Sequence, residues 1–120
     1  MEKTVLVVED LADSREVMRF LIEGYGYGVL EAPGPYEAIA KAQEFQPDLI
    51  LMDIGLPLMD GLTVAELISG MENLKHIPII VVTAYHDVRA RAMRAGCSGV
   101  LYKPVDPPKL KKVLDTHLGH

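Results

Sequence analysis

Three runs of this chain are apolar at successive positions rather than at every second one. They read VLVV at residues 5–8, LILM at 49–52 and IPIIVV at 77–82. A strand with one face in water alternates apolar and polar side chains, whereas a strand covered on both faces is apolar throughout. The three runs therefore predict parallel strands in a sheet that has helices on both sides.

Strand-like and helix-like segments alternate strictly along the chain. Strands are expected at residues 4–8, 28–32, 49–53, 77–83 and 99–103, and helices at residues 13–24, 36–45, 61–69, 86–95 and from about 107 onward. This alternation predicts right-handed crossovers and a doubly wound α/β fold, in which five helices flank a five-stranded parallel sheet. We expect the flavodoxin-like strand order 2-1-3-4-5. At 120 residues the chain fits one domain, which we place at residues 1–120.

Side-chain types at the helix starts suggest how two helices begin. Asp60–Gly61 is expected to form a turn and cap before the third helix. Asp13 or Ser14 is suited to cap the first helix. The apolar side of that first helix is expected to carry Val17, Phe20 and Leu21, with Met18 as a further candidate.

The charge and the apolar segments argue against two classes of function. The formal net charge of −5 is unfavourable for direct nucleic-acid binding, which relies on a basic face. No apolar run approaches the roughly 20 residues of a membrane span. Cys97 is the single cysteine and has no activating histidine beside it, so a reduced and unreactive thiol is expected. We expect a cytoplasmic globular protein that contacts neither nucleic acid nor membrane directly.

Polar residues follow four of the five expected strands. Glu9 and Asp10 end the first strand, Asp53 the third, Thr83 the fourth and Lys103 the fifth. The carboxyl ends of parallel strands meet at one edge of the sheet, and ligands bind there near the point where the strand order reverses. We therefore expect three acids, one hydroxyl and one lysine to converge at that edge.

The expected acid cluster has a chemical consequence. If the first and third strands are neighbours, Asp10 and Asp53 lie roughly 5 Å apart and repel each other. Either one carboxyl protonates or a cation sits between them, and a small set of hard oxygen ligands suits Mg²⁺ or Mn²⁺. A metal, a lysine and a hydroxyl are the groups that phosphoryl transfer needs, and an aspartate can itself act as the nucleophile.

Four stretches, in their order and spacing, resemble the receiver domain of two-component response regulators of the stand-alone type. They are VLVVED (5–10), DLILMDIGLPLMDG (48–61), PIIVVTA (78–84) and GVLYKPV (99–105). The resemblance implies that Asp53 accepts a phosphoryl group from a phosphohistidine of a sensor histidine kinase or a histidine phosphotransfer protein. It implies a changed protein-binding surface, read by a downstream protein target. A homodimer through the fourth helix, fifth strand and fifth helix is a further expectation.

The resemblance also implies a role for each polar residue at the sheet edge. Asp10 matches the acid that ligates Mg²⁺ directly, and Glu9 matches the acid that acts largely through water. Asp53 and the main-chain carbonyl of Gly55 match the other protein ligands. Thr83 matches the phosphate-binding hydroxyl and Lys103 the phosphate-binding lysine. Ala84 matches the small residue that leaves the phosphoryl site open, and the Lys103–Pro104 bond matches a peptide bond that is typically cis.

The chain departs from the family pattern at three places, one of which, Leu11 where many relatives carry a polar residue, has no clear consequence. Three residues before the lysine the family usually has Tyr or Phe, which moves inward on phosphorylation, and here Val100 stands there. Tyr102 shares that strand face by alternation, so either it substitutes or the aromatic step is absent. Gly55 has no side chain to steer water, and together with Tyr85 it should influence the lifetime of the acyl phosphate.

Three other functions fit the fold less well. A Mg²⁺-dependent phosphohydrolase of the haloacid dehalogenase type also uses an aspartate nucleophile, but it needs a second acid where this chain has Gly55. A flavin binder would place phosphate at the loop of residues 11–13, where the acidic Asp13 would repel it. A degenerate receiver used only for binding would not need the intact acid, hydroxyl and lysine set. We expect that the protein is not an enzyme and that it catalyses only its own phosphorylation and dephosphorylation.

Overall fold

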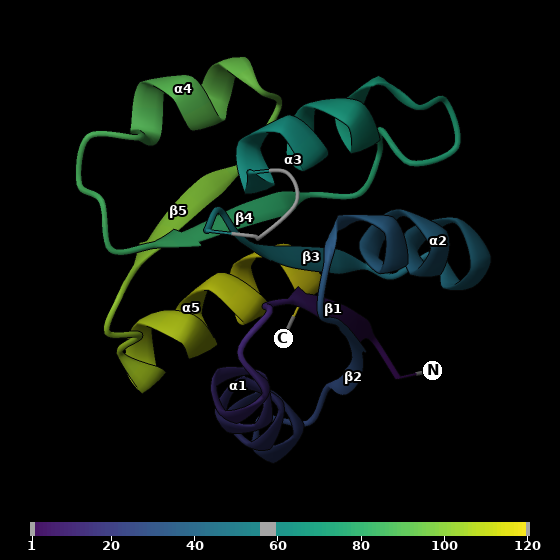
Figure 1. Cartoon of the computed structure of the whole chain (residues 1–120). Helices are drawn as coiled ribbons and strands as arrows, with labels where there is room; N and C mark the ends of the chain where they lie inside the picture. The colour runs from purple at the N-terminus through teal and green to yellow at the C-terminus, as the bar shows by residue number, and fades with distance from the viewer. Residues whose placement is uncertain (1, 56–59, 120) are drawn as a thin grey trace.

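The computed structural model describes residues 2–55 and 60–119, so the stretch 56–59 within the second family-like motif lies outside the described residues. Strands and helices alternate as predicted (Figure 1), in the order β1 (Thr4–Val8), α1 (Ala12–Gly24), β2 (Gly28–Ala32), α2 (Pro35–Phe45), β3 (Leu49–Asp53), α3 (Gly61–Gly70), β4 (Ile79–Thr83), α4 (Arg89–Arg94), β5 (Gly99–Tyr102) and α5 (Pro107–Leu118). No helix among the described residues is long and apolar enough to cross a membrane.

The five strands form one parallel sheet in the order β2-β1-β3-β4-β5, which confirms the predicted fold class and strand order. Val8 of β1 pairs with Met52 of β3, and Asp53 pairs with Val82 of β4. At the other side of β4, Thr83 pairs with Tyr102. The carboxyl ends of β1, β3, β4 and β5 are therefore level with one another.

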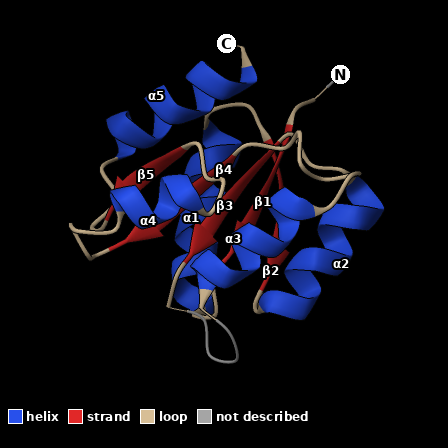
Figure 2. Cartoon of the chain, turned by 90° about the horizontal axis from the view of Figure 1, so that it is seen from above, coloured by secondary structure: helices blue, strands red, loops and turns tan. Residues whose placement is uncertain are grey.

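Successive residues of the central strands pack on opposite faces of the sheet. Leu6 and Ile50 belong to the core under α2, α3 and α4, whereas Val5 and Leu49 belong to the core under α1 and α5. Figure 1 shows α3 and α4 on one side of the sheet and α1 and α5 on the other, and Figure 2 shows the same layers from above. Burial on both faces explains why these strands carry apolar residues at every position.

Several predicted boundaries differ from those of the structure. Helix α1 begins at Ala12, so Asp13 and Ser14 lie inside its first turn, and Leu11 stands at the cap position without a side-chain cap. The N–H of Leu11 donates to the Glu9 carboxylate at 3.2 Å. Strand β4 begins at Ile79 rather than at residue 77, since proline at residue 78 has no N–H for the ladder. Helix α4 spans only Arg89–Arg94 rather than 86–95.

The predicted inner face of α1 was right only in part: Leu21 packs partly buried against the core and the further candidate Met18 is buried, but Val17 and Phe20 point outward. Met18 and Ile22 face the sheet, whereas Val17 is 59% exposed and Phe20 is 76% exposed. The cap of α3 agrees with the prediction, because the Asp60 carboxylate accepts a hydrogen bond from the Thr63 N–H at 3.1 Å. Side-chain type therefore located the start of α3 correctly but not the cap of α1.

Candidate functional site

Three carboxylates meet at the carboxyl edge of β1 and β3. The pairing of Val8 with Met52 sets Glu9 beside Asp53, and Asp10 follows in the loop to α1. One oxygen from each of these three acids lies within 4.8 Å of the others. Glu9 and Asp53 are buried, at 5% and 8% exposure, and Asp10 is exposed. The cluster thus has two carboxylates in its wall and one at its rim.

Lys103 approaches this cluster from the end of β5. Its Nζ lies 3.4 Å from Glu9 Oε1 and 3.6 Å from Asp53 Oδ2. The backbone N–H of Lys103 donates to the Thr83 carbonyl at 2.7 Å, and its peptide bond to Pro104 is cis, as the sequence led us to expect. One ammonium group between two of the three carboxylates leaves the cluster an excess of negative charge.

Burial and this negative charge together change the pKa of the Glu9 carboxyl. Burial, followed by hydrogen bonding with the Asp53 carboxyl, raises the pKa of Glu9 from an ordinary 4.5 to about 7, although the Leu11 N–H opposes the rise. Three hard oxygens that are incompletely neutralised, one of them open to solvent, fit a small divalent cation such as Mg²⁺. The residues present therefore suit the metal that the sequence predicted.

Thr83 lies at the neighbouring strand end with a buried side chain. Its Oγ1 accepts a hydrogen bond from the Tyr85 N–H at 3.0 Å, which fixes the start of the loop to α4. A hydroxyl that accepts one bond still has its own O–H to donate. Ala84, next to it, is exposed and adds no bulk beside the hydroxyl.

The sequence model of the response regulator receiver domain matches residues 5–115 of the chain. The chain belongs to this family. The receiver is 38% identical to the polar-differentiation response regulator DivK of Brucella ovis, over 99% of this chain and 98% of that protein. It is therefore a response regulator module of two-component signalling.

Solved structures of relatives agree with the fold of the receiver. The chemotaxis response regulator CheY4 of Vibrio cholerae is 29% identical and superposes with a TM-score of 0.90, over 97% of this chain and 98% of that chain. The receiver domain of sensor histidine kinase PA1611 from Pseudomonas aeruginosa is 30% identical, with a TM-score of 0.90 and full coverage of both chains. The structure of that domain has a magnesium ion coordinated in its active site cleft.

Two glycines of the receiver lie close to Asp53. The Gly55 N–H donates to Asp53 Oδ1 at 3.1 Å, and the role of the Gly55 carbonyl as a metal ligand stays a prediction. Gly61 packs its α-carbon against the backbone of Asp53 and Ile54. A Cβ there would lie 2.7 Å from the Ile54 Cα and 2.9 Å from the Asp53 carbonyl carbon, so a larger residue does not fit. The sequence indicated Gly61 only as part of a turn.

The two candidate switch residues have different surroundings. Val100 is partly buried and packs against the core under α2, α3 and α4. The Tyr102 ring stacks on His86 in the loop between β4 and α4, with ring centroids 4.6 Å apart and planes 9° from parallel. The aromatic contact between β5 and the loop that follows Thr83 is therefore made by Tyr102, two residues after Val100.

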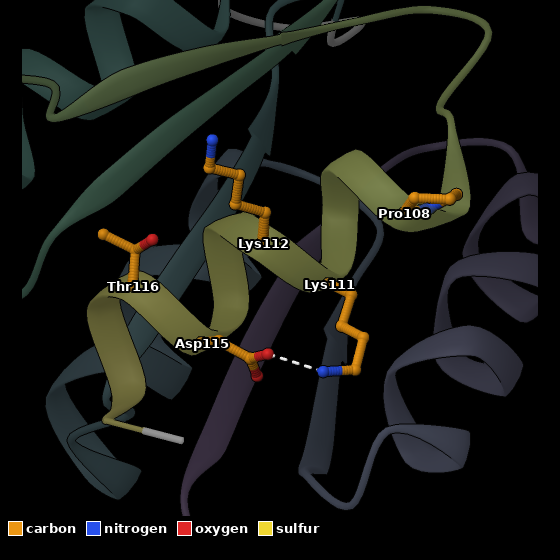
Figure 3. Close-up of a pocket in the computed structure, with 5 residues that line it drawn as sticks. All are labelled: Pro108, Lys111, Lys112, Asp115 and Thr116. Atoms are coloured by element: carbon orange, nitrogen blue, oxygen red, sulfur yellow. Dashed lines mark hydrogen bonds and ion pairs between the residues drawn. The ribbon is translucent and has the colours of Figure 1, made fainter.

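A separate shallow hollow runs along α5 and is lined by Pro108, Lys111, Lys112, Asp115 and Thr116 (Figure 3). Lys111 and Asp115 form an ion pair across it at 2.6 Å, and the Tyr27 hydroxyl donates to Asp115 at 2.7 Å. None of these lining residues belongs to the acid cluster. The candidate site is therefore the edge at Asp53 and not this hollow.

Proposed function

We infer that Asp53 accepts a phosphoryl group from the phosphohistidine of a sensor histidine kinase or a histidine phosphotransfer protein, in a Mg²⁺-dependent reaction. The observation that carries this proposal is the meeting of Glu9, Asp10 and Asp53 beside the ammonium group of Lys103. The family match over residues 5–115 supports it independently. The lysine, and a cation held by the buried acid cluster, can neutralise the negative charge of an incoming phosphoryl group.

The side chains around Asp53 have distinct parts in the proposed step. An Asp53 oxygen forms the new P–O bond while the P–N bond of the phosphohistidine breaks and its electron pair leaves with the imidazole. The Gly55 N–H holds Oδ1, and Lys103, 3.6 Å from Oδ2, is close enough to neutralise a phosphoryl oxygen. The Thr83 hydroxyl donates to another phosphoryl oxygen.

The metal set of the proposal consists of Glu9, Asp10, Asp53 and the Gly55 carbonyl. Bound there, Mg²⁺ supplies positive charge to the phosphoryl group as it approaches Asp53. Asp10, at the exposed rim, is the acid most open to a hydrated ion, and the buried Glu9 acts from behind it. Glu9 gives up its proton more readily once a cation adjoins it.

The proposed output is a changed protein-binding surface that a downstream protein recognises. Movement of Thr83 toward the phosphoryl group would displace the loop that contains Tyr85 and His86. Because Tyr102 stacks on His86, that movement reaches β5 through an aromatic contact. Tyr102, rather than Val100, is the switch residue of this proposal.

A phosphohydrolase is the weaker alternative, and we propose that the receiver catalyses only its own phosphorylation and dephosphorylation. A hydrolase of the aspartate type needs a second carboxylate two residues after its nucleophile, and Gly55 offers none. Steady release of phosphate from small phosphoesters over many turnovers would favour the hydrolase.

The test is intact-mass measurement after incubation with acetyl phosphate and Mg²⁺. Wild type should gain the mass of one phosphoryl group, which hydroxylamine removes, and chelation of the metal should prevent the gain. Asp53→Asn should gain nothing. Asp60→Asn serves as the folded control, because Asp60 is an exposed aspartate whose side-chain hydrogen bonds go to Thr63 at the cap of α3. Equal labelling of Asp53→Asn and wild type would contradict the proposal.

A further inference from the structure

The loop that carries the acid pair is tied to its surroundings by one arginine. Arg15, in α1, donates from Nη1 to the carbonyl of Glu9 at 2.9 Å and to the carbonyl of Asp10 at 3.3 Å. Its Nε donates to Glu31 Oε1 in β2 at 3.3 Å. The side chain of Arg15 is only 18% exposed. A single guanidinium therefore links two backbone carbonyls of the acid pair to a carboxylate on the neighbouring strand.

These two carbonyls are the ones that flank Asp10. The carbonyl of Glu9 belongs to the peptide plane before Asp10, and the carbonyl of Asp10 belongs to the plane after it. Two peptide planes determine the φ and ψ of the residue between them, and hence the direction of its Cα–Cβ bond. Arg15 thus holds the direction in which the exposed Asp10 carboxylate leaves the backbone.

Arg19 provides a natural comparison one turn along α1. It donates to Glu31 Oε2 at 2.6 Å and to Glu23 Oε2 at 3.2 Å, and its side chain is 46% exposed. Among the described hydrogen bonds, Arg19 has none to Glu9 or Asp10. Hydrogen bonds from Arg19 and then from Arg15 hold the pKa of the Glu31 carboxyl below its usual value, so Glu31 remains an ionised anchor.

We propose that Arg15 is a positioning residue for the divalent cation: it fixes the two peptide planes around Asp10 and so directs the Asp10 carboxylate into the acid cluster. This inference rests on the proposed function, because it takes Mg²⁺ as the cation of the site. Arg15 acts through the backbone and contacts neither the cation nor the phosphoryl group.

Positioning and simple electrostatics predict opposite effects of removing this arginine. A cation beside a metal site repels the metal, so by charge alone the loss of Arg15 should tighten Mg²⁺ binding. If Arg15 instead directs Asp10, its loss should weaken Mg²⁺ binding, because a carboxylate that samples several directions binds the cation less tightly. The sign of the change therefore separates the two roles.

The experiment measures the Mg²⁺ dissociation constant by amide chemical-shift titration of the full chain at constant pH and ionic strength. Arg15→Gln should bind Mg²⁺ at least fivefold more weakly than wild type. Arg19→Gln, which also removes one positive charge and one Glu31 contact, should stay within twofold of wild type. Glu31→Gln alone should bind Mg²⁺ more weakly than wild type. The double variant should bind about as weakly as Arg15→Gln, because Glu31 acts through Arg15.

Equal or tighter Mg²⁺ binding by Arg15→Gln would overturn the inference. Thermal unfolding in a chelator establishes that each variant is folded. If Arg15→Gln does not fold, Arg15→Lys decides, since lysine keeps the charge but lacks the planar fork that reaches two carbonyls and a carboxylate together. Binding weakened at least twofold in Arg15→Lys supports the inference, and binding equal to wild type overturns it. Failure of wild type to bind Mg²⁺ would instead refute the proposed function.

Discussion

The Glu9 carboxyl is buried beside Asp53 and keeps its proton to higher pH than an ordinary glutamate, with its pKa raised from 4.5 to about 7. Between these two values the folded chain binds more protons at Glu9 than the unfolded chain does. In the absence of a divalent cation, the free energy of unfolding should therefore fall as the pH rises from about 5 to 8, by no more than about 3 kcal/mol. Urea unfolding followed by circular dichroism in a chelator measures this.

Glu9→Gln is the matched variant for that pH dependence, because the amide keeps the shape of the side chain and cannot ionise. Its free energy of unfolding should change much less over the same pH interval. An equally steep fall in Glu9→Gln would show that another group is responsible.

Gly61 is constrained by contact rather than by backbone conformation. In Gly61→Ala the new methyl group meets the backbone of Asp53 and Ile54, which cannot yield as a flexible side chain would. We expect a loss of about 1–3 kcal/mol in stability and slower phosphorylation by acetyl phosphate. Urea unfolding and timed intact-mass measurements give the two quantities.

Gly70, at the other end of α3, is the control for Gly61. A Cβ at Gly70 would have nothing within 4 Å, so Gly70→Ala should leave the phosphorylation rate unchanged and should not lower stability. If the two alanine variants phosphorylate at the same rate, the contact of Gly61 with the Asp53 backbone has no part in holding the site.

The residues of the site differ in how far the sequence could predict their positions. Glu9, Asp10, Asp53 and Lys103 end strands, and strand ends of a parallel sheet share one edge, so their meeting follows from the strand order. The packing of Gly61 depends on how closely α3 approaches β3, which no local pattern encodes. The reach of Arg15 to two carbonyls depends on one rotamer of a long side chain, which is also absent from the sequence pattern.

Among the elements, β5 and the loop before α4 are joined by the stacked rings of Tyr102 and His86. If this contact transmits the change at Thr83, a phosphoryl mimic such as beryllofluoride should shift the amide resonances of β5 and α4 in wild type. In Tyr102→Ala these shifts should shrink while those around Asp53 persist. Two-dimensional NMR titration provides the measurement.

Tyr36→Ala is the control for that experiment, because Tyr36 is an aromatic residue on α2 that is 66% exposed. Its beryllofluoride shifts in β5 and α4 should match those of wild type. Shifts in Tyr102→Ala that are as large and as widespread as in wild type would exclude Tyr102 as the switch residue.

Helix α1 illustrates where the apolar pattern was insufficient. Apolar residues occur on two sides of this helix, so spacing selected the exposed Val17 and Phe20 along with Leu21 and Met18, which do pack on the core, and it missed the buried Ile22. We expect Phe20→Ser to change the free energy of unfolding by less than about 0.5 kcal/mol. Ile22→Ala should cost about 2–4 kcal/mol, since it leaves a cavity in the core. Urea unfolding compares them, and a larger loss in Phe20→Ser would contradict the observed orientation of α1.

For the whole molecule, the sequence was most informative about the order of layers. Runs that are apolar at every position require helices on both faces of the sheet, and strict alternation of elements leaves few topologies. Boundaries were less predictable: α1 begins before the expected caps Asp13 and Ser14, and α4 spans only Arg89–Arg94. The same sheet sets four strand ends at one edge, so the fold and the candidate site follow from one pattern.

Borohydride reduction tests directly whether Asp53 carries the phosphoryl group. Borohydride converts an aspartyl phosphate into homoserine, which peptide sequencing by mass spectrometry assigns to a single position. After treatment with acetyl phosphate and Mg²⁺, homoserine should be found at residue 53 and should be absent when the phosphodonor is omitted. Reduction at Asp10 instead, or phosphorylated protein with no homoserine at residue 53, would show that Asp53 is not the phosphorylated residue.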